Sequence, residues 1–111
     1  MNRISFVVAK LSELTEDLGR TVKLGDTGRE CTLFLHVGRC YAVGSLCPHQ
    51  NEPLDGARAE KGQIVCRRHR YRFDLKTGNC LTIGGYGLPT YPVDLCDDDV
   101  IVSTWNFEEP L

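Results

Sequence analysis

The sequence lacks a long hydrophobic run. Its apolar residues near the N-terminus, from Ile4 to Ala9, are interrupted by Ser5, and no other stretch approaches the roughly 18 apolar residues that a membrane-spanning helix needs. The same short stretch is also too small for the apolar centre of a signal peptide. We therefore expect a soluble, cytoplasmic protein that has no membrane partner.

An excess of charge of one sign is also missing. Lysine and arginine together number 13, against 15 aspartate and glutamate residues, for a formal net charge of -2. Domains that bind nucleic acid usually carry a basic surplus, so we expect no nucleic-acid partner. With 111 residues the chain has room for one modest core and not for two. A single domain over residues 1–111 is therefore expected.

A sustained helical period is absent as well. Short runs of β-type residues are separated by turn residues, and this pattern is typical of antiparallel strands. The expected strands are 4–8, 21–24, 31–37, 39–43, 63–65, 71–75, 91–95 and 100–103. The expected helical feature is a short turn within 12–19 with Ser12 as its cap, and the tail from Trp105 onward has no strand pattern. The fold class we predict is all-β, built of antiparallel sheets.

Two short pairs of Cys and His stand out in this sequence. Cys47-Pro48-His49 is followed, after sixteen residues, by Cys66-Arg67-Arg68-His69. Each pair offers one soft thiolate and one imidazole to a single metal centre. A structural zinc site usually groups its ligands by type, as Cys-x-x-Cys followed by His-x-x-x-His, whereas here each half carries one of each. The mixed pairs favour a binuclear iron centre, and a zinc-stabilised interaction module remains the alternative.

The paired motif resembles the Rieske [2Fe-2S] signature, in which two His replace two Cys on one of the two irons. The stretch 66–79, CRRHRYRFDLKTGN, looks like the second ligand loop and following strand of a Rieske ferredoxin. The stretch 88–93, LPTYPV, is similar to the segment after the family's proline-bearing loop. The resemblance implies a small β-sandwich-like domain in which a cluster-binding subdomain, about 46–75, is inserted between hairpins.

The resemblance also implies the ligand set and the activity. One [2Fe-2S] cluster per chain would be held by Cys47 and Cys66 on the inner iron and by His49 and His69 on the outer iron. The protein would be a ferredoxin, not an enzyme, that carries electrons from a flavin-dependent reductase to a terminal oxygenase, commonly one that hydroxylates aromatic rings. We expect a monomer with no dedicated small-molecule site. The alternative within the family is the small Rieske-like subunit of an assimilatory nitrite reductase.

High-potential members of the family have features that this sequence does not match. They carry an extra Cys in each ligand loop, joined as a disulfide, where this chain has Glu52 and Arg68. They also place a Ser and a Tyr hydroxyl after the last His, where this chain has Tyr71 and Phe73. Hydrogen bonds to the cluster sulfurs raise the reduction potential. The resemblance therefore implies a potential toward the low end of the Rieske range.

Several other side chains admit more than one interpretation. Cys31, Cys40, Cys80 and Cys96 are expected to be buried free thiols that behave as small hydrophobes. The four arginines 67, 68, 70 and 72 form either a basic docking rim or the polar face of a half-exposed strand. The glycines around Tyr86 predict a flexible covering loop, and Pro89 lies where the family has its cluster-shielding proline. His36 is expected to be an ordinary surface histidine or one with a satisfied partner.

Overall fold

The structure is a computed structural model that describes residues 3–48, 51–68 and 70–105 of the chain. Apart from one short 3-10 turn, η1 (Leu11–Glu13), its regular elements are all strands. The strands are β1 (Arg3–Lys10), β2 (Arg20–Lys23), β3 (Glu30–His36), β4 (Arg39–Gly44), β5 (Leu46–Cys47), β6 (Glu52–Pro53), β7 (Arg58–Glu60), β8 (Gln63–Val65), β9 (Arg72–Asp74), β10 (Thr90–Tyr91), β11 (Val93–Cys96) and β12 (Asp99–Trp105). The predicted all-β fold class is confirmed.

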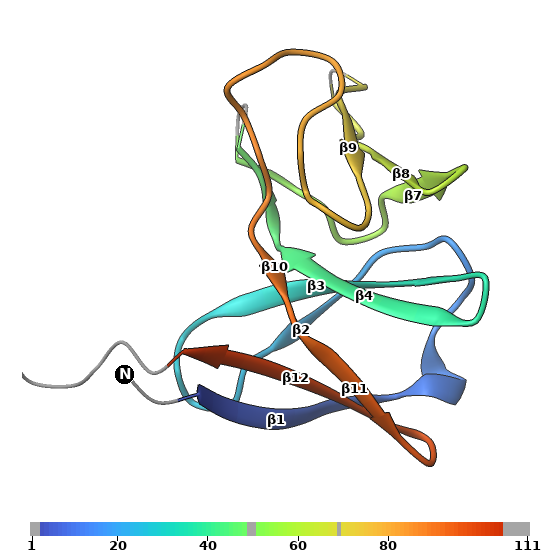
Figure 1. Ribbon diagram of the computed structural model, residues 1–111, viewed down its shortest axis with the longest axis vertical. Helices are drawn as coiled ribbons and strands as arrows, with labels where there is room; N and C mark the ends of the chain where they lie inside the picture. Colours follow the sequence, from blue (N-terminus) through green and yellow to red (C-terminus); the bar gives the residue numbers. More distant parts are fainter. Residues whose placement is uncertain (1–2, 49–50, 69, 106–111) are drawn as a thin grey trace, which may run out of the picture.

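Two antiparallel sheets form the base of the molecule (Figure 1). One has the strand order β1-β12-β11 and the other the order β10-β4-β3-β2. Exposed and half-buried residues alternate along β1 from Arg3 to Val8, and the alternation breaks at Ala9, where the pairing with β12 shifts its register. The core between the sheets contains Leu24, Cys31, Leu33, Ala42, Val100 and Val102. This apolar layer fixes the base on which the rest of the chain is mounted.

The hairpin of β3 and β4 is the best-predicted part of the base. His36 pairs with Arg39, so the turn consists of Val37 and Gly38, whose φ angles are 49° and 74°. A two-residue turn with two positive φ angles matches the right-handed twist of the strands. A positive φ is unusual for a β-branched residue, and the Val37 N–H donates to Glu16 Oε1 at 2.6 Å. The turn is thus held from outside the hairpin.

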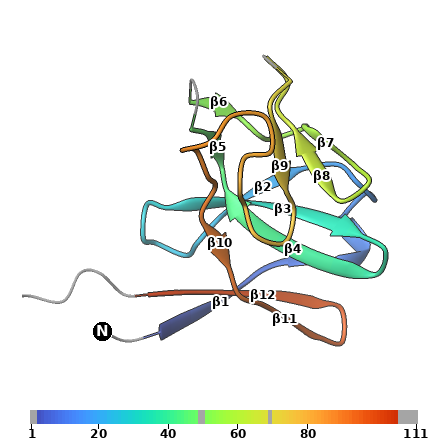
Figure 2. The ribbon, with the colours of Figure 1, turned by 45° about the horizontal axis from the view of Figure 1, so that its top comes forward.

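The strands β5 to β9 form two small sheets at one end of the base, which we call the tip (Figures 1 and 2). The tip lies between β4 and β10 in the chain, as the predicted insertion requires. Its core joins residues of the tip to two side chains of the base. This core contains Phe34, Val43, Cys47, Leu54, Ala57, Ala59, Ile64, Cys66, Phe73, Leu75 and Leu88. Strands this short are not stable alone, so the shared core is what orders the tip.

Three sequence-based expectations at the ends of elements were wrong. Tyr91 belongs to β10 and pairs with Ala42 of β4, because Pro92 cannot donate a backbone hydrogen bond and the chain crosses there to the other sheet. Trp105 is not part of an unpatterned tail, since it ends β12 opposite Arg3; residues 106–111 lie outside the described part. Ser12 does not cap the helical turn but donates its hydroxyl to Asp98 Oδ2 at 2.6 Å.

The cysteines outside the two motifs are free, as expected, but they differ in burial. Cys31 is buried, and Cys40 and Cys80 are half-buried. Cys96 is exposed, which contradicts the expectation that all four are buried, because it ends the edge strand β11 beside a turn. In the described part of the chain, no helix has the length and apolar character needed to cross a membrane.

Gly78→Ala should lower the unfolding midpoint more than Gly28→Ala does. Both glycines have left-handed φ angles, 79° and 80°, so both substitutions carry the same backbone strain of about 1–2 kcal/mol. At position 78 the added Cβ would also press against the carbonyl oxygen of Leu88, whereas at position 28 it would meet nothing within 4 Å. Thermal unfolding followed by circular dichroism checks this, and equal midpoints for the two variants would contradict the packing of Gly78 against Leu88.

The exposed thiol should react with iodoacetamide well before the two thiols of the base core. Burial raises the pKa of Cys31 to about 12 and that of Cys40 to about 11, and only the thiolate is nucleophilic. At pH 8 both thiols are therefore neutral, and the labelling of Cys40 should increase only as the pH rises toward 11. Peptide mass spectrometry of the folded protein measures this. Cys96→Ser is the control that removes the fast site, and rapid labelling of Cys31 at pH 8 would contradict the structure.

Candidate metal centre

Cys47 lies at the base of a tight loop. It ends β5 and pairs with Glu52 of β6, and the Asn51 N–H donates to the Cys47 carbonyl at 2.7 Å. Asn51 has a φ of 55°, a left-handed conformation that asparagine tolerates better than most residues. The second predicted ligand of this loop, His49, lies outside the described residues.

Cys66 occupies the same position in a second loop. It follows β8, its N–H donates to the Tyr71 carbonyl at 2.8 Å, and its own carbonyl accepts the Arg70 N–H at 3.0 Å. Arg70 has a φ of 57°. In both loops, therefore, the cysteine carbonyl accepts a hydrogen bond from the residue four positions later, and that residue is left-handed. His69 falls within this loop in the sequence and lies outside the described residues.

The two thiols have the surroundings that an iron–sulfur centre requires. Cys47 is 1% exposed and Cys66 is 2% exposed, and both belong to the apolar core of the tip. Neither is joined in a disulfide. Soft thiolate donors in a dry, apolar shell suit an iron–sulfur cluster. The donor set present therefore fits the predicted [2Fe-2S] cluster.

Two aromatic side chains, Tyr71 and Phe73, follow the second loop. Phe73 is fully buried opposite Ile64 and has no hydroxyl. Tyr71 is half-buried and packs edge-on against Tyr86, with ring centroids 6.5 Å apart. The covering loop predicted from Gly84, Gly85 and Gly87 around Tyr86 lies within residues 81–87, which are exposed throughout. It is anchored at its start, where the Leu81 N–H donates to the Arg72 carbonyl at 2.7 Å.

The segment after this loop returns to the first ligand loop. Leu88 is buried, and its N–H donates to the Gly78 carbonyl at 2.8 Å. The next residue, Pro89, accepts the Gly44 N–H at 2.9 Å. Gly44 ends β4 and lies three residues before Cys47, and a Cβ at this position would meet the Pro89 ring at 2.9 Å. Pro89 thus packs on the strand that leads into the first loop.

The four arginines divide into two groups. Arg72 lies on β9 and contacts Glu60 at 3.3 Å and Gln63 at 3.4 Å, so it belongs to the polar face of the small sheet. The other three lie in the second ligand loop and are exposed. Glu52 and Arg68 occupy the positions where high-potential members of the family have the two disulfide-bonded cysteines. Here the two side chains form an ion pair, with Arg68 Nη1 3.6 Å from Glu52 Oε1.

A second group of candidate ligands lies on the base. Glu16, Asp17 and His36 bring one ligand atom each within 4.8 Å of one another. The structure explains their proximity without a metal. His36 Nδ1 lies 2.7 Å from Asp17 Oδ1, and Glu16 accepts the N–H of the hairpin turn at Val37. His36 therefore has a satisfied partner, as expected, although the sequence did not indicate which one.

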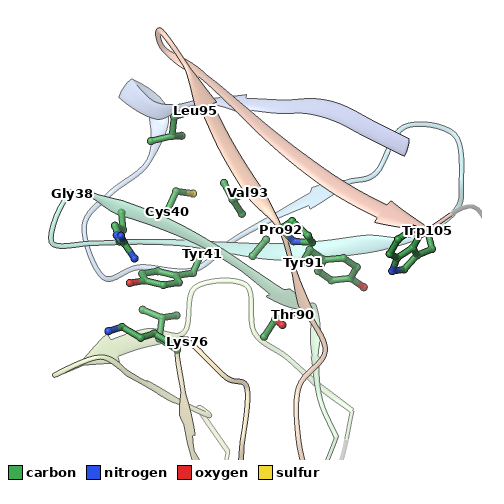
Figure 3. A pocket seen from close by; sticks show the side chains of 13 residues that line it. Gly38, Cys40, Tyr41, Lys76, Thr90, Tyr91, Pro92, Val93, Leu95 and Trp105 are labelled. Atoms are coloured by element: carbon green, nitrogen blue, oxygen red, sulfur yellow. The ribbon is translucent and has the colours of Figure 1, made fainter. Parts of the chain in front are cut away.

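A groove of the base is separate from the two cysteines. It measures about 760 Å³ and runs along β4 and the crossover from β10 to β11 (Figure 3). Tyr41, Tyr91 and Trp105 line it, whereas Cys47 and Cys66 do not. The groove therefore does not contribute to the metal centre. That the chain has no dedicated small-molecule site stays a prediction.

Comparison with known proteins agrees with this geometry. The family model of the Rieske [2Fe-2S] domain matches residues 5–92. The ferredoxin component of the naphthalene 1,2-dioxygenase system of Pseudomonas putida is 34% identical over 88 residues, which are 77% of this chain and 81% of that protein. The ferredoxin component of the alkene monooxygenase system of Xanthobacter autotrophicus is 30% identical over 83 residues, 74% of this chain and 65% of that protein.

A solved structure extends the likeness to the whole fold. A small subunit of an NADH-dependent nitrite reductase from Mycobacterium tuberculosis superposes with a TM-score of 0.83 and covers 96% of this chain and 99% of that one. At 21% identity this likeness shows the fold alone. Together with the family match over residues 5–92, the two buried thiols at equivalent places in two closed loops lead to one conclusion: the chain belongs to the Rieske [2Fe-2S] domain family, and its cofactor is a [2Fe-2S] cluster.

Proposed function

We propose that this protein is a Rieske-type ferredoxin that carries single electrons between larger proteins. The observation that carries the proposal is the pair of equivalent loops, each with a buried thiol at its base. The two relatives named above, from Pseudomonas putida and Xanthobacter autotrophicus, are ferredoxin components of oxygenase systems, and this supports a reductase and a terminal oxygenase as the partners. The nitrite reductase subunit shares the fold at lower identity, so the carrier function is favoured.

Cys47, His49, Cys66 and His69 are the proposed ligands, in one domain that spans residues 1–111. What supports this set is the position of the two cysteines, since each starts a loop that also contains one of the histidines. When bound, the cluster takes up and releases one electron. Two neutral imidazoles in place of two thiolates remove two negative charges from the ligand set, which eases reduction and raises the potential above about −400 mV, the value of all-Cys plant-type ferredoxins.

The end of the tip has the surface of a docking site. Four apolar side chains are exposed there: Leu46 on β5, and Leu81, Ile83 and Tyr86 in the loop between β9 and β10. These two segments lie at the same end of the molecule (Figures 1 and 2). The exposed Arg70 of the second ligand loop adds positive charge there. A partner with an apolar contact surface and an acidic margin would fit, and the opposite charges would speed the encounter.

Purified protein should contain two irons and two acid-labile sulfides per chain and should be red-brown. His49→Ala and His69→Ala should lose most of the visible absorbance, because each removes one ligand of the cluster. His36→Ala is the matched control, since the third histidine of the chain is paired with Asp17 and should leave the iron content unchanged. Metal analysis and the visible spectrum measure both. A colourless protein with one zinc per chain would contradict the proposal.

The midpoint potential at neutral pH should lie near the bottom of the Rieske range, on the order of −150 mV. Phe73 offers no hydroxyl, and the Tyr71 hydroxyl stands too far from its backbone to replace that of a serine. Tyr71→Ser combined with Phe73→Tyr should raise the midpoint, whereas Tyr71→Ala should not. Voltammetry of the three proteins checks this, and a wild-type midpoint well above zero would show that other groups set the potential.

A further inference from the structure

Arg67 and Arg68 lie between Cys66 and His69, the proposed ligands of the second loop, and the side chains of both arginines contact the segment that contains the first loop. Arg67 Nη1 donates to the Asp55 carbonyl at 3.2 Å. Arg68 Nη1 lies 3.6 Å from Glu52 Oε1. Neighbouring arginines thus make two separate contacts across the gap between the ligand loops.

The acceptors of these contacts are themselves fixed. Glu52 is paired directly with Cys47 in the β5–β6 ladder, and its side chain is only 24% exposed. Asp55 is tied to the base, since its Oδ1 accepts the Thr21 N–H at 2.8 Å. An arginine that binds either residue therefore holds the second loop to a defined place beside the first.

Backbone contacts do not provide this connection. Among the described residues, no backbone hydrogen bond joins 45–55 to 66–70, and each loop closes on itself or on its own sheet. The loops share the apolar core beneath them, and Arg67 and Arg68 add two polar contacts between the described parts of the loops. Arg70 is also exposed and lies in the same loop, but it makes no such contact with the described residues.

We propose that Arg67 and Arg68 are positioning residues that hold the two ligand loops together and so slow the loss of the cluster. The inference rests on the proposed ligand set. A cluster bound from two loops leaves the protein when the loops separate, because each loop alone supplies only half of the ligands. Contacts that restrain the separation of the loops slow the loss of the cluster. A positive charge in the second loop that has no partner in the first loop, such as that of Arg70, does not slow it.

The test measures the rate at which the holoprotein loses its visible absorbance in the presence of an iron chelator. Arg68→Gln and Glu52→Gln should each speed the loss by about two- to fivefold, the range expected for one exposed ion pair. The charge swap Glu52→Arg with Arg68→Glu should restore most of the wild-type rate, because the pair is re-formed. Arg70→Gln, which removes the same charge from the same loop, should leave the rate unchanged.

A second readout separates positioning from general destabilisation. Holding the loops at one separation should narrow the EPR signal of the reduced cluster, so Arg68→Gln should broaden it, and the charge swap should narrow it again. If Arg68→Gln cannot be isolated with its cluster, Arg67→Gln tests the same idea through the Asp55 contact. Equal loss rates for Arg68→Gln and Arg70→Gln, or a charge swap as fast as the single variants, would overturn the proposal.

The outcomes also separate this proposal from the proposed function. A wild-type protein without iron and sulfide would refute the ligand set itself. A protein that keeps its cluster but does not pass electrons to a partner would refute the carrier function and leave the role of Arg67 and Arg68 intact.

Discussion

The structure depends on burying two thiols, from separate parts of the chain, in the same apolar core. Cys47 and Cys66 are almost completely buried, yet each stands at the base of a loop that closes through a hydrogen bond to its own carbonyl. Cys47 ends β5 and Cys66 follows β8, and strands of two or three residues such as these cannot be stable alone. They are ordered because Leu54, Ile64 and Phe73 pack in the same core as the cysteines. The two thiols are therefore buried by the same packing that orders the tip.

The base determines where this tip stands. Phe34 and Val43 extend from the larger sheet into the core of the tip. A backbone hydrogen bond adds a second connection, since the Gly19 N–H donates to the Ala57 carbonyl at 2.8 Å. The chain leaves the base at Gly44 and returns at Pro89, where the two residues share a hydrogen bond. Entry and exit thus lie side by side, and the tip stands at one end of the base (Figure 1).

Local patterns made the main features predictable. Alternation and Gly38 predicted the β3–β4 hairpin, and the spacing of the Cys/His pairs predicted the cofactor. Features set by distant contacts were not predictable. The alternation at Tyr91 fits either sheet, so the crossover at Pro92 left no clear signal. Nothing in the sequence marks Arg70 as left-handed, and the left-handed Asn51 of the first loop was not predicted either. The contacts of Arg67 and Arg68 span the gap between loops, which sequence spacing does not show.

Pulsed EPR of the reduced protein with 15N-labelled histidine is the most direct test of mixed ligation from two loops. Two inequivalent couplings to 15N are expected, one from each imidazole bound to the same iron. His36→Ala should preserve both couplings, since His36 is held by Asp17 on the base. A reduced cluster without strong coupling to histidine nitrogen would mean that the ligands are thiolates alone or come from elsewhere, and the assignment of His49 and His69 would be wrong.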